Sequence, residues 1–428
     1  MFTRDIALED CILDLIDNSM DALLSTRKID IESEFLAQSK GQTKTKSGKA
    51  QIRLDYSEKR LSIVDDCGGI PYAEARNEVF CFGHKPDAPK RRLGVYGIGM
   101  KRAIFKIGNH IQVVSNTGND AFQVDIDVKE WAEKDGSLDD WTFPIVKLDG
   151  AALKMPAGTR ITISGLHDEV KSRLDEGTIA KALSRSVAQS YPFFLGKLVD
   201  VVINGDLVEP IPLPWGGSED VNPGVARFEQ DGVKVTILAT VAPKERRSQE
   251  FAGWYVMCNG RVVVNADKTA LTGWGSVLPA FHSKYVGFVG LALLTSSDPS
   301  SLPWTTSKRG LNREALVFQR ARNVMAGVAK PVITFLNDLY PSDPSEDPGE
   351  RLVAEGVKQR DFRPLLAEPT GPFTRKVLPA QKKTVRVQFD AYIADIEKIK
   401  KKLRRQGLTA SDVGRLTFNH YLDTECAE

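Results

Sequence analysis

The sequence offers little material for covalent or metal-based stabilisation. Its 428 residues include five cysteines and five histidines, and both residue types are scattered along the chain. No two cysteines have CxxC spacing, so neither a disulfide framework nor a zinc site is indicated. The cysteines are Cys11, Cys67, Cys81, Cys258 and Cys426.

Long apolar runs are also lacking. No stretch approaches the roughly 18 apolar residues of a membrane span, and the first residues do not begin like a signal peptide. We therefore expect a soluble, cytoplasmic protein with no membrane partner. An apolar content of 42% in a chain of this length predicts two or three domains with substantial cores.

A helix with an unusual polar face is expected near the N-terminus. Asp14, Asn18 and Asp21 follow one another at i+4 and i+3, so one face of the helix carries oxygen atoms. Taken alone, three polar groups on a solvated helix would be ordinary. The apolar positions recur at helical spacing and can fill a core: Leu8, Ile12, Leu15, Ile16 and Leu23.

An acidic strand end follows about forty residues later. Residues 60–64 alternate as a strand, and they run into Asp65, Asp66 and a tight glycine turn that ends at residue 71. A strand end is a rigid support for a side chain, so one of these carboxylates is a candidate for binding a ligand.

Two further motifs complete the series. Residues 93–101 contain glycines that let backbone amides approach phosphate groups, at the point where a helix over residues 100–107 is expected to start. Residues 157–163 supply a small turn, the hydroxyl of Thr159 and an alternating strand.

These four motifs, in this order, resemble the Bergerat-type ATP site of the GHKL superfamily. That superfamily includes gyrase-type topoisomerases, the ninety-kilodalton heat-shock chaperones, histidine kinases, MutL and MORC proteins. The resemblance covers roughly residues 5–165. It implies ATP and Mg²⁺ as cofactors and ATP hydrolysis as the activity.

The resemblance assigns roles along the polar helix. Asn18 would hold the Mg²⁺ ion that bridges the phosphates, which suits a neutral oxygen ligand beside water. Asp14 would be the general base. Most relatives have a glutamate there, and a misplacement of about 1 Å can cost ~10²-fold in rate, so hydrolysis could be slow. Asp17 and Asp21 would cap and brace the helix.

The other ATP contacts come from the remaining motifs. Lys101, directly after the phosphate glycines, would reach a phosphate oxygen. Residues 82–92 resemble the ATP lid, from which Lys85 or Arg92 would contact a phosphate or remain solvated. The full expected set is Asn18, Asp65, Gly69, Ile70, Gly94, Gly97, Ile98, Gly99, Met100, Lys101 and Thr159.

The adenine-reading carboxylate has two candidates. In the family, a glycine-flanked aspartate accepts the exocyclic amine of adenine. Strand alternation favours Asp65, but this register puts Cys67 where a glycine is usual. The alternative, Asp66, keeps Gly68 as the first glycine and puts Ile70 at the second. Both registers stay open.

Residues 171–340 are predicted to form a second, α+β domain in which strands precede a packed helix. The order resembles the transducer domain of gyrase, MutL and MORC proteins, and the turn at residues 258–261 resembles MutL's Asn-Gly-Arg hairpin. The expected elements are a helix over 178–189, a strand with its hairpin turn over 198–206, strands over 233–241 and 287–294, a hairpin over 254–264, and a helix over 313–339.

In those families a loop of the second domain sends a lysine into the ATP site. The candidate here is Lys308, in the loop over residues 302–310, with Arg309 as the fallback. A cation there would stabilise charge that develops on the leaving phosphates. The alternative is a loop lysine in water.

The C-terminal part is expected to be a proline-rich linker over residues 341–380 and a β-α-α module over 381–428. The module has an alternating strand over 384–389, a helix from a cap at Asp390 to about residue 405, and a helix over 407–423. This order resembles a ribbon-helix-helix DNA-binding module.

In the ribbon-helix-helix fold, two chains pair their strands and insert them into the major groove of duplex DNA. Thr384, Arg386 and Gln388 would then face the bases. A basic end of the first helix, over residues 398–405, would add phosphate contacts. The alternative is a basic coiled coil or a tail that only dimerises.

Taken together, we expect an α+β protein: a Bergerat ATP-binding α/β sandwich over residues 1–170, then the transducer-like domain, the linker and the C-terminal module. It would be a homodimeric ATPase switch that acts on or near DNA, with room for a further protein partner. Repair, chromosome compaction and phage defence all fit. The rival is a chaperone-like or regulatory nucleotide-binding scaffold that does not hydrolyse ATP.

Overall fold

A computed structural model gives the fold. It describes residues 6–40, 48–80, 93, 99–132, 143–151, 153–305, 307–339, 346–347, 353–367, 369–377, 381–382 and 387–426. The chain divides into two compact units, Met1–Ala380 and Gln381–Glu428. Among the described helices, none combines the length and the apolar character that a membrane crossing requires.

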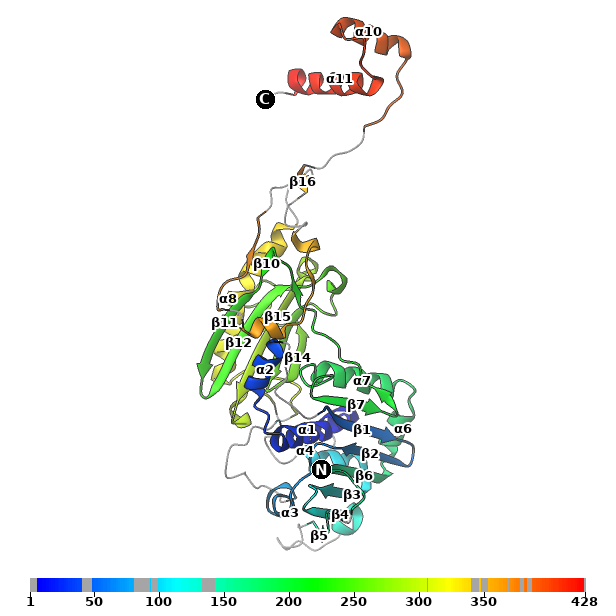
Figure 1. Cartoon of the computed structure of the whole chain (residues 1–428), viewed down its shortest axis with the longest axis vertical. Coiled ribbons are helices and arrows are strands. Elements are labelled where there is room, and N and C mark those ends of the chain that lie inside the picture. Colours follow the sequence, from blue (N-terminus) through cyan, green and yellow to red (C-terminus); the bar gives the residue numbers. More distant parts are fainter. Residues whose placement is uncertain are drawn as a thin grey trace. The chain divides into compact units, whose positions relative to one another are not determined.

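The larger unit contains two sheets, and each sheet together with the helices that pack on it is called a layer. The first layer is built on an eight-stranded mixed sheet with the order β5-β4-β3-β6-β2-β1-β7-β8 (Figure 1). All neighbouring strands are antiparallel except β1 and β7. The strands are β1 (Ala50–Tyr56), β2 (Arg60–Asp65), β3 (Gly108–Asn116), β4 (Ala121–Asp127), β5 (Ile145–Leu148), β6 (Gly158–Leu166), β7 (Val199–Ile203) and β8 (Asp206–Leu207).

Helices cover this sheet, and α1 and α4 pack side by side against it (Figure 1). The apolar stripe predicted for the first helix is buried: Leu8, Ile12, Leu15, Ile16 and Leu23 all belong to the core. The helices of this layer are α1 (Leu8–Thr26), α3 (Tyr72–Glu74), the π-helix η1 (Ala75–Val79), α4 (Gly99–Ile107), α5 (Val128–Ala132), α6 (Asp168–Asp175) and α7 (Ile179–Ser190). Helix α2 (Ile31–Ser39) instead lies at the second sheet, where Glu32 pairs with Lys234 (Figure 1).

The second layer is a five-stranded sheet with the order β11-β12-β15-β13-β14, and helix α8 (Leu316–Asp338) packs against β11, β12 and β15. The β13–β14 turn has positive φ at both Asn259 and Gly260, which confirms the Asn-Gly hairpin. The strands are β11 (Gly224–Gln230), β12 (Val233–Val241), β13 (Gly253–Cys258), β14 (Arg261–Asp267) and β15 (Phe288–Ser296).

The boundary between the two layers differs from the expected one at residue 170. Strand β7 pairs in parallel with β1, with Val201 opposite Ile52, and β8 extends the same sheet. The first layer therefore continues to Leu207, and α6 and α7 are its connecting helices. The pairing joins strands about 150 residues apart, so no local pattern reveals it.

The stretch expected to be a linker packs onto the larger unit where the structure describes it. Strand β17 (Lys358–Gln359) pairs with β9 (Gly216–Gly217), and β18 (Thr374–Arg375) pairs with β10 (Val221–Asn222). This stretch is therefore a strap on the larger unit despite its prolines. Its apolar side chains enter the core: Val353, Ala354, Val357, Phe362 and Phe373.

Short elements complete the chain. They are the 3₁₀ helices η3 (Lys244–Arg246), η4 (Ser283–Tyr285), η5 (Pro299–Ser301) and η6 (Arg363–Ala367), and the two-residue strands β16 (Glu346–Asp347) and β19 (Gln381–Lys382).

The smaller unit contains two helices, α10 (Ile393–Leu403) and α11 (Ala410–Glu425), which contact each other. Thr409 caps α11 in a reciprocal capping box with Asp412. Asp390 was predicted to cap the first of these helices. This was wrong, because the N-cap of α10 is Tyr392. Of the predicted strand over 384–389, residues 384–386 lie outside the described residues, and residues 387–389 are not in a strand.

Candidate functional site

Helix α1 carries a row of acidic side chains on a helix that is otherwise built into the core. Asp14, Asp17 and Asp21 are all buried, and Asn18 is half-buried between them along the helix. A buried carboxylate is costly unless charged or hydrogen-bonding partners surround it. Each of these aspartates has such a partner, and the partners come from different parts of the fold.

Asp14, the expected general base, lies against the start of α4. Its Oδ2 is 3.0 Å from Nη2 of Arg102, and both side chains are largely buried. Gly99, the first residue of α4, is so close that an added Cβ would lie 3.4 Å from Asp14 Oδ2. The carboxylate is therefore fixed beside Gly99, the last glycine of the phosphate-glycine motif.

Asn18 has a polar atom that the fold does not use. Its Nδ2 is buried and has no hydrogen-bond partner in the described part of the chain. A side-chain amide can turn to present either its nitrogen or its oxygen, so Asn18 is free to offer an oxygen ligand. The described residues contain no cluster of three or more acidic, histidine or cysteine side chains suited to a metal. A single amide ligand fits Mg²⁺, which keeps water and phosphate oxygens around it.

Asp65 faces the interior and Asp66 faces outward. Asp65 Oδ2 accepts a hydrogen bond from Ser19 Oγ at 2.8 Å, and its Oδ1 accepts from the amides of Cys67 at 2.9 Å and Thr159 at 3.2 Å. Burial raises the pKa of Asp65, while these three donors favour its charged form. Asp66 is exposed and accepts from the amide of Gln51. This geometry favours Asp65 as the carboxylate that meets a bound base.

The glycine turn after Asp65 is tightly packed against neighbouring backbone. Gly69 has a φ of +72°, and a Cβ there would overlap the carbonyl of Asn116. The next amide, of Ile70, donates to Ser115 Oγ at 2.7 Å, and this oxygen lies 3.0 Å from Thr159 Oγ1. Gly69, Ile70 and Thr159 are thus brought together beside Asp65.

Part of the expected phosphate site lies outside the described residues, namely Gly94, Gly97, Ile98 and the lid residues Lys85 and Arg92. Within α4, Met100 and Lys101 are buried. Lys101 takes part in a polar or electrostatic contact, so its side chain is already engaged. Its contact with a phosphate stays a prediction.

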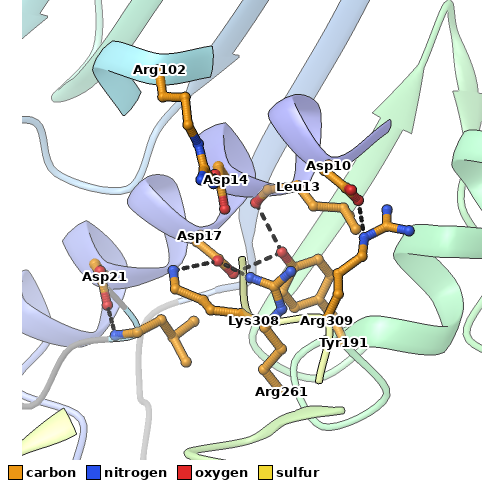
Figure 2. A network of polar contacts seen from close by, with 11 residues as sticks. Asp10, Leu13, Asp14, Asp17, Asp21, Arg102, Tyr191, Arg261, Lys308 and Arg309 are labelled. Carbon is orange, nitrogen blue, oxygen red and sulfur yellow. Dashed lines mark hydrogen bonds and ion pairs between the residues drawn. The ribbon is translucent and has the colours of Figure 1, made fainter. Parts of the chain in front are cut away.

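Lys308 reaches α1 from the second layer (Figure 2). Only 7% of the residue is exposed, and its Nζ donates to Asp17 Oδ2 at 2.7 Å. Lys308 has a φ of +53°, a conformation that a residue with a side chain rarely adopts. The next residue, Arg309, pairs with Asp10 one helical turn before Asp14. Lys308 is therefore not a loop lysine in water.

Asp17 is the residue whose role the sequence did not reveal. It is fully buried and accepts from both Lys308 and Arg261 at the same oxygen, Oδ2 (Figure 2). The hydroxyl of Tyr191 lies 2.8 Å from Asp17 Oδ1 and 3.1 Å from the carbonyl of Leu13. The expected capping role of Asp17 was wrong. Asp21 does brace α1, because it accepts from the amide of Leu93.

Burial weakens the charged forms of the two cations on Asp17. Burial, with Arg261 nearby, lowers the pKa of Lys308 to about 8. Burial also lowers the pKa of Arg261 to about 10. Desolvation thus outweighs the attraction of the carboxylates, and both cations lie where a further negative charge would be favourable.

Sequence reasoning missed Arg102, Arg261 and Tyr191. Arg102 comes one turn after Gly99 on α4, so its position relative to the glycine motif could have identified it as a site residue. Arg261 was noticed only as part of the hairpin turn. Tyr191 follows α7 and carries no motif, so its contact with Asp17 depends on the tertiary structure alone.

Comparison with protein families finds a match to the N-terminal third of the chain. Residues 6–147 match the family described as histidine kinase-, DNA gyrase B-, and HSP90-like ATPase. The match includes α1, the Asp65 turn and the start of α4, and it supports the GHKL family. The mixed sheet with its covering helices agrees with the ATP-binding α/β sandwich of that family. Thr159 lies beyond the matched residues but joins the site through Asp65. A search of curated proteins found no match.

The hydroxyl of Tyr191 is expected to stabilise the fold because its acceptor is a buried charge. Tyr191→Phe should lower the free energy of unfolding by about 1.5–3 kcal/mol, measured by urea denaturation at neutral pH. Tyr255→Phe is the matched control, since Tyr255 donates to the neutral carbonyl of Phe251 at 2.8 Å. It should cost about 0.5–1.5 kcal/mol. Equal losses would show that Asp17 is not a charged acceptor.

Proposed function

We propose that the chain is a GHKL-type ATPase that uses ATP binding and hydrolysis as a conformational switch. The observation that carries the proposal is the contact of Lys308, from the second layer, with α1 at Asp17, one turn from Asp14. Together with the family match over residues 6–147, it supports an ATP site that is completed by the second layer.

Asp65 is proposed to read adenine. Its two oxygens already accept from Ser19, Cys67 and Thr159, which fixes the carboxylate in one orientation. A carboxylate accepts a strong hydrogen bond from an exocyclic amine. The tight turn at Gly69 brings backbone close to the same place, and Asn18 holds Mg²⁺, which neutralises phosphate charge when it is bound.

Asp14 is proposed to orient and deprotonate the attacking water. A general base must lie within about 2.6–3.2 Å of the proton donor, directly or through one water. The ion pair with Arg102 keeps the carboxylate in place beside Gly99. Because aspartate is one methylene shorter than the usual glutamate, a second water or a closer approach of the helix is required, and turnover is slow.

Lys308 is proposed to stabilise charge on the phosphates during hydrolysis. To do so, the Lys308 ammonium group either contacts Asp17 and a phosphate together or moves away from Asp17. In both cases Arg261 still neutralises the Asp17 carboxylate. A change at the phosphates thus alters a contact between α1 and the second layer. This makes the two layers respond to the nucleotide state, which is the property of a switch.

The smaller unit is proposed to pair with a second copy of the chain and to bind duplex DNA. Apolar side chains on and before its two helices are exposed, as the dimer-forming face of a ribbon-helix-helix module would be in a single chain: Val387, Phe389, Tyr392, Ile393, Phe418, Tyr421 and Leu422. Gln388, one expected base contact, is exposed. The other two, Thr384 and Arg386, lie outside the described residues.

ATP binding should depend on Asp65 and not on Asp66. Losing a hydrogen bond to a charged group costs ~1.5–3 kcal/mol, roughly ten- to a hundredfold in affinity. Asp65→Asn should show this loss when ATP and Mg²⁺ are titrated by calorimetry. Asp66→Asn, an outward-facing neighbour, should bind as the parent does. If neither substitution changes the affinity, the proposed adenine site is incorrect.

Asp14 and Lys308 should act on turnover more than on binding. Asp14→Asn and Lys308→Ala should each lower phosphate release by at least about tenfold, with ATP affinity nearly unchanged. Arg309→Ala tests whether Arg309, the fallback cation, acts in place of Lys308. This variant should retain turnover, because Arg309 is paired with Asp10. A parent protein that binds ATP but releases no phosphate, with or without DNA, would support the rival non-hydrolysing scaffold.

Turnover should also fall as pH rises through about 8. Below this pH Lys308 is protonated, and above it the cation is lost, because burial has lowered its pKa to about 8. The charged groups around it are Asp14, Asp17 and Asp21 on α1, with Arg261 and Arg102 opposite. Lys308→Arg should keep its charge over this range and flatten the decline.

DNA binding should show the salt dependence of phosphate contacts. If each dimer neutralises about four to eight phosphates, log affinity should fall against log salt with a slope of roughly −4 to −7. Lys402→Gln should flatten the slope by about 0.9 for each phosphate that Lys402 neutralises, whereas Lys59→Gln, in the larger unit, should not. A full-length dimer without salt-dependent DNA binding would leave the smaller unit an oligomerisation device.

A further inference from the structure

A cavity of about 150 Å³ lies between α7, β14 and the loop that carries Lys308. Leu13 of α1 contributes to its wall, so the cavity lies beside the helix of the proposed ATP site. Neither Asn18 nor Asp65 lines it, and of the residues proposed to act on ATP only Lys308 does. Its polar wall includes Ser186 and Ser190 from α7 and Asn265 from β14.

All charged side chains that line the cavity are cationic: Arg261, Lys308 and Arg309. Their acidic partners, Asp17 and Asp10, belong to α1 and are not part of the wall. The cavity therefore presents donors and positive charge to whatever enters it. A cation would find no carboxylate ligand there.

One of these cations has a donor to spare. Arg261 is only 2% exposed, and its Nε is buried with no hydrogen-bond partner in the described part of the chain. A buried donor without a partner is unfavourable. The planar guanidinium group of Arg261 is suited to several oxygens of one anion at once.

The volume limits what the cavity can take. Liquid water occupies about 30 Å³ per molecule, so the space corresponds to roughly five waters. That is enough for a tetrahedral oxyanion. Burial lowers the pKa of Lys308 and of Arg261, and a negative charge in the cavity would favour the charged forms of both.

We infer that this cavity binds a phosphate-type oxyanion, separately from the nucleotide. The free ion and the phosphoryl group of a nucleic-acid backbone share this chemistry, and the small volume of the cavity fits the free ion. Because Arg261 and Lys308 also hold Asp17, an anion there competes with that carboxylate and loosens the contact between α1 and the second layer.

The test is a calorimetric titration of the full chain with inorganic phosphate, without nucleotide and in a buffer free of other oxyanions.

Two variants probe the cavity wall. Asn265→Asp adds a negative charge to the wall with almost no change in shape, and Ser190→Asp adds one from α7. Both should weaken phosphate binding by at least about tenfold through charge repulsion. Ser184→Asp is the matched control: it lies on the same helix, is similarly buried and does not line the cavity. Phosphate binding should be unchanged in it.

Several outcomes would overturn the inference. One is a parent chain that shows no saturable phosphate binding. Another is equal phosphate affinity in Asn265→Asp, Ser190→Asp and Ser184→Asp, which would place the phosphate elsewhere. A third is a short duplex oligonucleotide that competes with phosphate for the parent chain but not for Asn265→Asp. This result would identify a backbone phosphoryl group as the ligand instead of the free ion. ATP affinity is measured in the same variants and should not change, so failure of the ATP proposal would be seen independently.

Discussion

The structure depends on one buried carboxylate that two layers share. Asp17 belongs to the N-terminal helix, yet its charge is balanced by Lys308 and Arg261, both from the second layer. Removing one member of such a cluster leaves an uncompensated charge in a low-dielectric interior, at a typical cost of about 3–5 kcal/mol. The two layers are therefore joined by an electrostatic contact at the helix that carries Asp14 and Asn18.

The same principle organises the rest of α1. Its other acidic side chains are satisfied by different parts of the chain: Glu9 by Arg173, Asp10 by Arg309, Asp14 by Arg102 on α4, and Asp21 by the backbone amide of Leu93. Asn18, by contrast, keeps a buried amide nitrogen without a hydrogen-bond partner among the described residues. The helix is thus held on several sides while this neutral amide remains available to a ligand.

Local sequence patterns predicted much of this site but not its long-range partners. The spacing of Asp14, Asn18 and Asp21, the strand ending at Asp65 and the Asn-Gly hairpin each follow from residues close in sequence, and the structure contains all three features. The contacts of Asp17 and the pairing of β1 with β7 join residues more than 140 positions apart. Proline content suggested a linker over 341–380, but Phe362 and Phe373 enter the core. The composition of a segment indicates only how polar it is on average. Whether the segment packs on a domain depends on a few apolar side chains.

A buried ion cluster is an inefficient way to hold two layers together. Apolar side chains of similar volume often give equal or greater stability, because each charge must be removed from water. An apolar contact, however, cannot exchange its partner for a phosphate oxygen, whereas the ammonium group of a lysine can pair with either a carboxylate or a phosphate oxygen. Arg261 also pairs with Asp17, so this carboxylate would keep a cationic partner if Lys308 turned to an anion. On the proposed function, an exchangeable ion pair is a physical reason for charge to be buried at this interface.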